Sequence, residues 1–240
     1  MELTPNSLEF NVFLILTITL LIGKLLLSGF LAFKVRQRTK ERGEFKLDFI
    51  FGVFIMVVCL FVSRLILMIV DFYLVEFNTE QYYLSPNIEL WKIGNFIGMI
   101  GMAFLLWIVD KNVLKFRFKG ILSYIYLIAG LIALLWPVST KKGYTFVSAI
   151  FMFSQLLTII LPIIFINLGL KVPALRDLAL IMALGILIYL SGVIIISDPI
   201  MGIFRVILGE NAEFIVFFIF FALKITGLSL FTYGTAKFSL

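Results

Sequence analysis

The chain has 240 residues, of which 62% are hydrophobic and 14% are charged, and its formal net charge is +6. A soluble domain carries about 45–50% apolar and about 25% charged residues, and much of a small domain's surface stays in contact with solvent. This composition excludes a soluble globular domain, a disordered chain and a disulfide scaffold. We therefore expect an all-α polytopic protein of the cell membrane.

Seven apolar runs are long enough to cross a bilayer, because a hydrocarbon core about 30 Å thick requires about 20 helical residues. The runs are continuous rather than alternating, which favours helices over a barrel of strands. We expect one domain over residues 1–240, a seven-helix transmembrane bundle, with a short interfacial helix between the last two spans. The predicted spans are residues 10–34, 48–75, 88–110, 119–138, 144–169, 177–197 and 212–235.

Lysine and arginine are concentrated in one set of connections between these runs. Cytoplasmic loops carry an excess of these residues, which predicts an N-terminus outside the cell and a C-terminus in the cytoplasm. A basic inner face also predicts contact with anionic lipid headgroups, whereas charges spread over several short loops argue against nucleic-acid binding. The predicted inner residues are Lys34, Arg36, Arg38, Lys40, Arg42, Lys46, Lys111, Lys115, Arg117, Lys119, Lys171, Arg176 and Lys237, and the outer connections carry Lys141, Lys142 and Arg205.

Charged residues inside predicted spans are costly in lipid and therefore mark candidate functional positions. Lys24 is close enough to the inner basic segment for its ammonium group to reach the membrane surface. Arg64 and Asp71 share one helix face but lie about 10 Å apart along the axis, so we expect no direct pair between them within the helix, although both could belong to one polar cluster. The alternative to a functional role for Arg64 is an interhelical salt bridge, or a contact with backbone carbonyls, that stabilises the bundle.

Lys224 lies near the middle of the last run, about 15–20 Å from either membrane surface. Its amine requires an anion, a group of carbonyls, a water-filled cavity or a covalent partner, unless burial keeps it neutral. We interpret Lys224 as a ligand contact in a central cavity, with packing as the alternative.

Polar residues on other spans extend this hypothesis. Asn95, Gln155 and Tyr189 lie on faces that we expect to line an outward-opening cavity, although ordinary interhelical hydrogen bonding is the alternative. Because interior cations outnumber interior anions, an anionic or carbonyl-bearing ligand is favoured. The predicted ligand-binding residues are Lys224, Arg64, Asp71, Gln155, Asn95 and Tyr189.

Catalytic chemistry has few candidates in this sequence. There is no histidine, Cys59 is the single cysteine, and Asp71 has no second intramembrane carboxylate beside it. These residues cannot build a nucleophile–histidine system or a thiolate metal cluster. We expect a protein that is not an enzyme and that has no metal site and no cofactor.

The segment 222-ALKITGLSLF-231 resembles the retinal-lysine segment of microbial rhodopsins, with Lys224 at the Schiff-base position. The resemblance implies a seven-helix fold and retinal on Lys224. The rest of the chain departs from that pattern. Phe220 replaces the aspartate one turn before the lysine, and the third run has no mid-span carboxylate to act as counter-ion. These departures disfavour retinal.

The third run, 90-LWKIGNFIGMIGMAFLLW-107, and the predicted layout are similar to prokaryotic seven-helix sensor modules found N-terminal to histidine kinases. That resemblance implies a sensor or receptor that binds a small or lipid-like ligand within the bundle and signals through a partner. It would be a free-standing subunit, read at the basic loops 34–47 and 111–119. The alternatives are a small transporter or channel, and an accessory subunit that docks on a partner or a second copy through Gly94 and Gly98.

Overall fold

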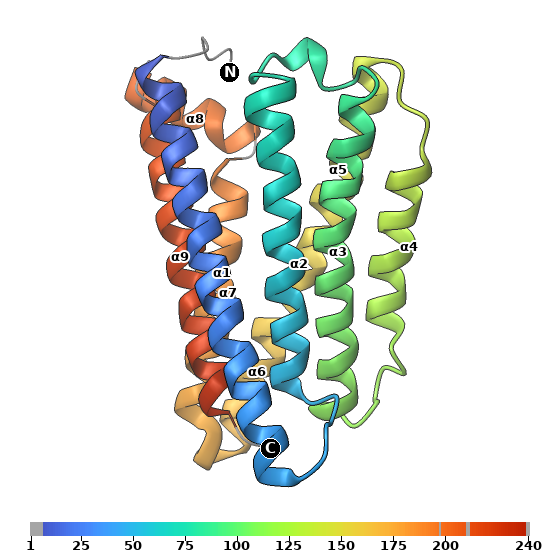
Figure 1. Ribbon diagram of the computed structural model, residues 1–240, viewed down its shortest axis with the longest axis vertical. Coiled ribbons are helices and arrows are strands. Elements are labelled where there is room, and N and C mark those ends of the chain that lie inside the picture. The colour runs from blue at the N-terminus through green and yellow to red at the C-terminus, as the bar shows by residue number, and fades with distance from the viewer. Residues whose placement is uncertain (1–6, 197, 210–211, 239–240) are drawn as a thin grey trace. The chain divides into compact units, whose positions relative to one another are not determined.

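The computed structural model describes residues 7–196, 198–209 and 212–238, and all regular structure in these ranges is helical (Figure 1). In the described ranges, nine α-helices are joined by one π turn, three 3₁₀ turns and short loops. In chain order the elements are α1 (Leu8–Arg42), α2 (Phe49–Ile69), η1 (Val70–Leu74), η2 (Thr79–Gln81), α3 (Asn87–Asn112), α4 (Ile121–Leu135), α5 (Lys141–Leu156), η3 (Leu157–Ile159), α6 (Ile160–Lys171), η4 (Pro173–Leu175), α7 (Arg176–Ile195), α8 (Asp198–Leu208) and α9 (Ala212–Lys237).

Each of the seven predicted spans falls on helix, and six helical stretches in the described ranges are long and apolar enough to cross a membrane. The chain is therefore built as a multi-pass membrane protein. The exception is α4, whose 15 residues extend about 22 Å, so the seventh span and the orientation of the termini stay predictions. Ser197, the last residue of the sixth predicted span, lies outside the described residues.

The described chain divides into two compact units. Unit 1 comprises residues 24–158 and unit 2 comprises residues 8–23 and 159–238, so α1 contributes to both. Both units contain membrane-length helices. The prediction of one bundle over the whole chain stays a prediction.

In unit 1, α2 packs along α3 through glycines on α3 (Figure 1). A Cβ atom at Gly98 would lie 3.1 Å from the Ser63 hydroxyl, and one at Gly101 would lie 2.5 Å from the Cβ of Cys59. Gly94 likewise faces α2 side chains. The glycine face of α3 is therefore used within unit 1, which is the close helix approach that such small-residue spacings permit.

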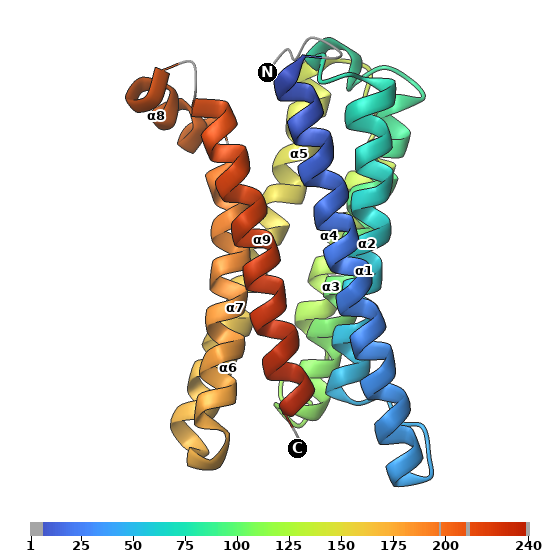
Figure 2. The same cartoon turned by 60° about the vertical axis from the view of Figure 1, so that its left-hand side comes forward.

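In unit 2, α7 and α9 pack against each other by direct backbone contact, and both figures show them side by side (Figure 2). A Cβ atom at Gly227 would lie 2.5 Å from the backbone nitrogen of Tyr189, and one at Gly185 would lie 2.6 Å from that of Phe231. The first part of α1 joins this pair through an apolar cluster, in which Leu20 packs on α9 residues. The short helix between α7 and α9, predicted from the sequence, is α8.

Candidate functional site

Arg64 and Asp71 form an ion pair in unit 1, with 3.5 Å between Nη1 of Arg64 and Oδ2 of Asp71. The expectation of no direct pair was therefore wrong. It counted the axial rise between the backbones and neglected the length of the arginine side chain. The chain between the two residues also changes from α-helix to the π turn η1. Turns of this kind are rare in proteins, and those that do occur are often found at functional sites.

Tyr82 completes this polar centre from the loop that follows α2. Its hydroxyl donates to Oδ1 of Asp71 at 3.0 Å. Burial, assisted by the Asp71 carboxylate, raises the pKa of the Tyr82 hydroxyl, so the hydroxyl stays protonated and remains a donor. The sequence analysis missed this contact, because an aromatic residue eleven positions along a loop carries no periodic signal.

A group of aromatic rings lies beside Tyr82 and joins it to α3 and α5. The Tyr82 ring is 5.8 Å from Tyr144, Tyr144 is 5.0 Å from Trp91, and Trp91 is 5.6 Å from Phe151, measured between centroids. These rings supply an apolar surface next to the Arg64–Asp71 pair. Flat apolar walls with a few fixed polar groups are the usual make-up of small-molecule sites.

Asn95 and Gln155 each lie one turn beyond a ring of this group, Asn95 after Trp91 and Gln155 after Phe151. The Asn95 side-chain amide donates to the Trp91 backbone carbonyl at 2.9 Å, and the backbone carbonyl of Gln155 accepts from the Thr158 hydroxyl at 2.6 Å. Both side chains are half-buried. Together with Arg64 and Asp71, these two residues bring to four the predicted site residues that belong to unit 1.

Two further buried lysines of unit 1 donate to backbone carbonyls. The ammonium of Lys24 lies 2.9 Å from the Leu60 oxygen, one turn before Arg64 on α2. That of Lys92 lies 3.0 Å from the Trp136 oxygen. Both lysines are buried, so these bonds satisfy groups that would otherwise be costly to remove from water. Lys24 binds a neighbouring helix instead of extending to the membrane surface.

Lys224 and Tyr189 meet in unit 2. Lys224 is buried on α9, and its ammonium lies 3.7 Å from the centroid of the Tyr189 ring on α7 and 5.5 Å from that of Phe220. Its stem passes Gly192, where an added Cβ would lie 3.5 Å from the Lys224 Cγ. A cation over an aromatic face is an electrostatically favourable arrangement. The single cavity expected to join this lysine to the unit 1 residues stays a prediction.

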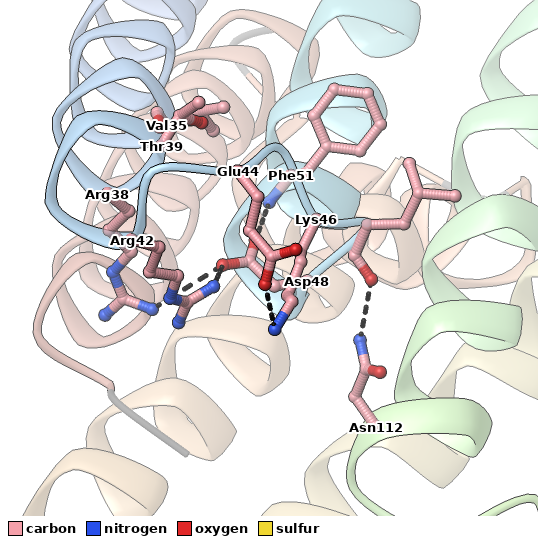
Figure 3. A network of polar contacts seen from close by, with 10 residues as sticks. Val35, Arg38, Thr39, Arg42, Glu44, Lys46, Asp48, Phe51 and Asn112 are labelled. Carbon is pink, nitrogen blue, oxygen red and sulfur yellow. Dashed lines mark hydrogen bonds and ion pairs between the residues drawn. The ribbon is translucent and has the colours of Figure 1, made fainter.

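At the other end of α2, Asp48 caps the helix and holds the basic segment (Figure 3). Its carboxylate accepts from the Phe51 backbone N–H at 3.1 Å, and it pairs with Arg42 at 2.9 Å and Arg38 at 3.9 Å. Next to it, the Leu47 carbonyl accepts from the Asn112 amide at 3.2 Å. The two basic segments predicted to carry the signal are thus in contact at the start of α2.

No protein-family model, curated protein or solved structure matches the chain. In the described residues, no three cysteine or acidic side chains gather in a way that would hold a metal ion.

Proposed function

We propose that this chain is a sensor or receptor-like protein of the cell membrane, without catalytic activity of its own. It binds a small or lipid-like ligand bearing an anionic or carbonyl group at the Arg64 centre and signals through a partner protein. The observation that carries this proposal is the structure of α2, which has a half-buried ion pair at a π turn near one end and the basic segment paired with its capping residue at the other.

The Arg64–Asp71 contact supports an anionic ligand. At 3.5 Å it is longer than a normal N–H···O hydrogen bond of about 2.7–3.2 Å. Guanidinium groups bind carboxylates and phosphates in a two-pronged geometry that adds specificity. A ligand anion would compete with Asp71 for Arg64, while the neighbouring rings would cover its apolar part.

The π turn provides a way for a bound ligand to change the conformation of α2. The Arg64–Asp71 pair bridges α2 and η1, so weakening it favours a different winding at the outer end of the span. A ligand shifts an equilibrium only by its difference in affinity for the two states. Here that difference comes from whether Arg64 bonds to Asp71 or to the ligand.

The signal reaches the other end of the molecule because α2 is one continuous helix from Phe49 to Ile69. A shift or rotation of this helix reaches Asp48, whose contacts hold Arg42 on one side and whose neighbour Leu47 is held by Asn112 on the other. We propose that a partner protein reads the resulting movement of the basic segments 34–47 and 111–119. The Lys224–Tyr189 contact of unit 2 is the second place at which a ligand would bind.

Native mass spectrometry of the gently purified protein tests this proposal. Wild type is compared with Arg64→Gln and with Arg205→Gln, a matched control in which an exposed arginine loses its pair with Glu213. We expect a stoichiometric small-molecule adduct on wild type and on the control, and its loss from Arg64→Gln. Hydrogen exchange at residues 43–48 is expected to change when the adduct is removed.

Other outcomes contradict the proposal in distinct ways. An adduct on all three proteins, or on none, excludes the Arg64 centre as the ligand site. An adduct lost only in Lys224→Ala moves the site to unit 2, and a mass shift that survives denaturation identifies a covalent link. Liposome flux that depends on Arg64 replaces the receptor by a transporter.

A further inference from the structure

The loop between α3 and α4 is held in one conformation by a buried carboxylate. Asp110 is buried and accepts from the backbone N–H of Phe118 at 3.0 Å and from that of Gly120 at 2.7 Å. Its own carbonyl accepts from the N–H of Phe116 at 2.8 Å. Asp110 therefore organises the turn from inside, through bonds that leave the loop side chains free to point outward.

The side chains of this loop alternate between cationic and aromatic. Residues 115–119 read Lys-Phe-Arg-Phe-Lys, and all five are exposed. Among the described residues, the three cations of this segment form no salt bridge. The Phe116 ring makes an edge contact with the Trp107 ring, with 6.2 Å between centroids. The ammonium of Lys111 lies 5.0 Å from the centroid of the Trp107 ring.

The length of α4 places this loop near the hydrocarbon boundary. If α4 crosses the membrane, its 15 residues extend about 22 Å, less than the hydrocarbon thickness of about 30 Å. A short span is accommodated by local thinning of the bilayer and by flanking side chains that reach the interface. The 115–119 segment immediately precedes α4, so in such a span it would adjoin the interface between the acyl chains and the headgroups.

The neighbouring loop extends the same surface. Phe45 and Lys46 are exposed, and Leu47, next to them, is bonded to Asn112 at the end of α3. Of the acidic residues in this region, Asp48 pairs with Arg42, and Glu44 pairs with Lys46 and offsets its charge, so the positive charge of the surface comes from Lys115, Arg117 and Lys119. The surface therefore keeps a net positive charge beside exposed aromatic rings.

We propose that residues 115–119, with Phe45 and Lys46, form a binding site for anionic phospholipid headgroups. Clustered cations next to a span attract anionic lipids, and aromatic rings favour the membrane interface. The alternation favours a lipid over an acidic protein segment, because an ionic protein contact would leave Phe116 and Phe118 in water. This site goes beyond the proposed ligand centre and does not depend on it, but it lies on the basic segments 34–47 and 111–119 that we propose a partner reads, so a bound lipid would share that surface with the partner.

The full chain reconstituted in bilayer nanodiscs tests the site. One set of discs contains phosphatidylcholine alone, and the other contains phosphatidylcholine with phosphatidylglycerol. After transfer to detergent, native mass spectrometry counts the phosphatidylglycerol molecules retained per chain. Lys115→Gln with Lys119→Gln is compared with Lys141→Gln and Lys142→Gln, which removes the same charge from the opposite end of unit 1.

We expect wild type and the 141/142 variant to retain phosphatidylglycerol, and the 115/119 variant to retain it about threefold less or weaker still. Equal retention by the two variants overturns the proposal, because only the total charge then matters. Unchanged lipid retention in the 115/119 variant, with loss of binding to a poly-glutamate peptide, also overturns it and assigns the surface to an acidic protein. Arg64→Gln is expected to retain the lipid, which separates this site from the ligand centre.

Discussion

The helix pair α2–α3 of unit 1 and the pair α7–α9 of unit 2 both pack closely through glycine residues. They differ in the groups that contact the cations at these helices. Both pairs approach closely where glycine replaces a side chain, at Gly101 in the first and Gly227 in the second. In unit 1, two cations have oxygen acceptors: the half-buried Arg64 pairs with Asp71, and the buried Lys24 bonds to the Leu60 carbonyl. In unit 2, Lys224 lies over the ring of Tyr189.

This difference separates two ways in which a membrane protein accommodates a cation. An ion pair depends on both partners, and removing one leaves an uncompensated charge in a poorly solvated place. A cation over a ring depends on the face of the ring and tolerates any aromatic residue that presents one. We therefore expect single substitutions in the polar centre of unit 1 to lower stability more than those at the Lys224–Tyr189 contact. We also expect a ligand to shift the conformation of unit 1 more easily.

The largest effect is expected where the two pairs are alike. Gly227→Ala places a methyl group 2.5 Å from the Tyr189 nitrogen and 2.6 Å from the Gly185 oxygen, and backbone atoms cannot move aside as a flexible side chain can. We expect a loss of about 3 kcal/mol in the free energy of unfolding, the upper end for overpacking. Chemical unfolding in detergent micelles measures this loss.

Gly29→Ala is the matched control, since a Cβ atom at Gly29 meets nothing within 4 Å. It is expected to leave stability unchanged or to raise it by up to about 1 kcal/mol through helix propensity. If the two substitutions cost the same, close backbone packing does not hold α7 and α9 together.

A somewhat smaller effect is expected from breaking the pair that distinguishes unit 1. Arg64→Met leaves the Asp71 carboxylate in a half-buried place with Tyr82 as its donor. We expect a cost of about 2–3 kcal/mol, somewhat below that of a fully buried pair. Unfolding of Arg64→Met, Asp71→Leu and the double variant forms a complete double-mutant cycle.

The double variant is expected to recover most of the lost stability, because replacing both charges by apolar groups removes the uncompensated carboxylate. A double variant as unstable as the sum of its parts would show that the two side chains act independently. The comparison with unit 2 would then lose its basis.

The smallest effect is expected at the cation–ring contact of unit 2. Tyr189→Leu removes the aromatic face under Lys224 and is expected to cost about 1–2 kcal/mol. Tyr189→Phe keeps that face and is expected to cost less than half as much. The same unfolding measurement compares them, and a phenylalanine variant as unstable as the leucine variant would assign the role of Tyr189 to its hydroxyl.

Much of the fold followed from local sequence. Each apolar run predicted a helix, because a chain in lipid satisfies its backbone hydrogen bonds within each segment. The small-residue spacing on α3 indicated close helix packing, and α3 does pack against α2. The glycines that join α7 to α9 were not recognised, since they are single residues on two separate helices and only their alignment makes them an interface.

The candidate site was predicted in part. Arg64, Asp71 and Lys224 stood out because charge inside an apolar run is rare and costly. Their contacts did not follow from spacing: Tyr82 reaches Asp71 from a loop, and Tyr189 reaches Lys224 from another helix. Asp110, which organises the α3–α4 loop, was missed because it lies at the end of a run, where an acidic residue is unremarkable.

The sequence by itself determined that this is a helical membrane protein and that Lys24, Arg64, Asp71 and Lys224 lie within apolar runs, because hydrophobicity and length are properties of single segments. The tertiary structure decided which groups satisfy those charges: a carboxylate and a tyrosine for Arg64 and Asp71, backbone carbonyls for Lys24 and Lys92, and an aromatic ring for Lys224. Partners of this kind come from other segments, and their approach depends on how closely the helices pack.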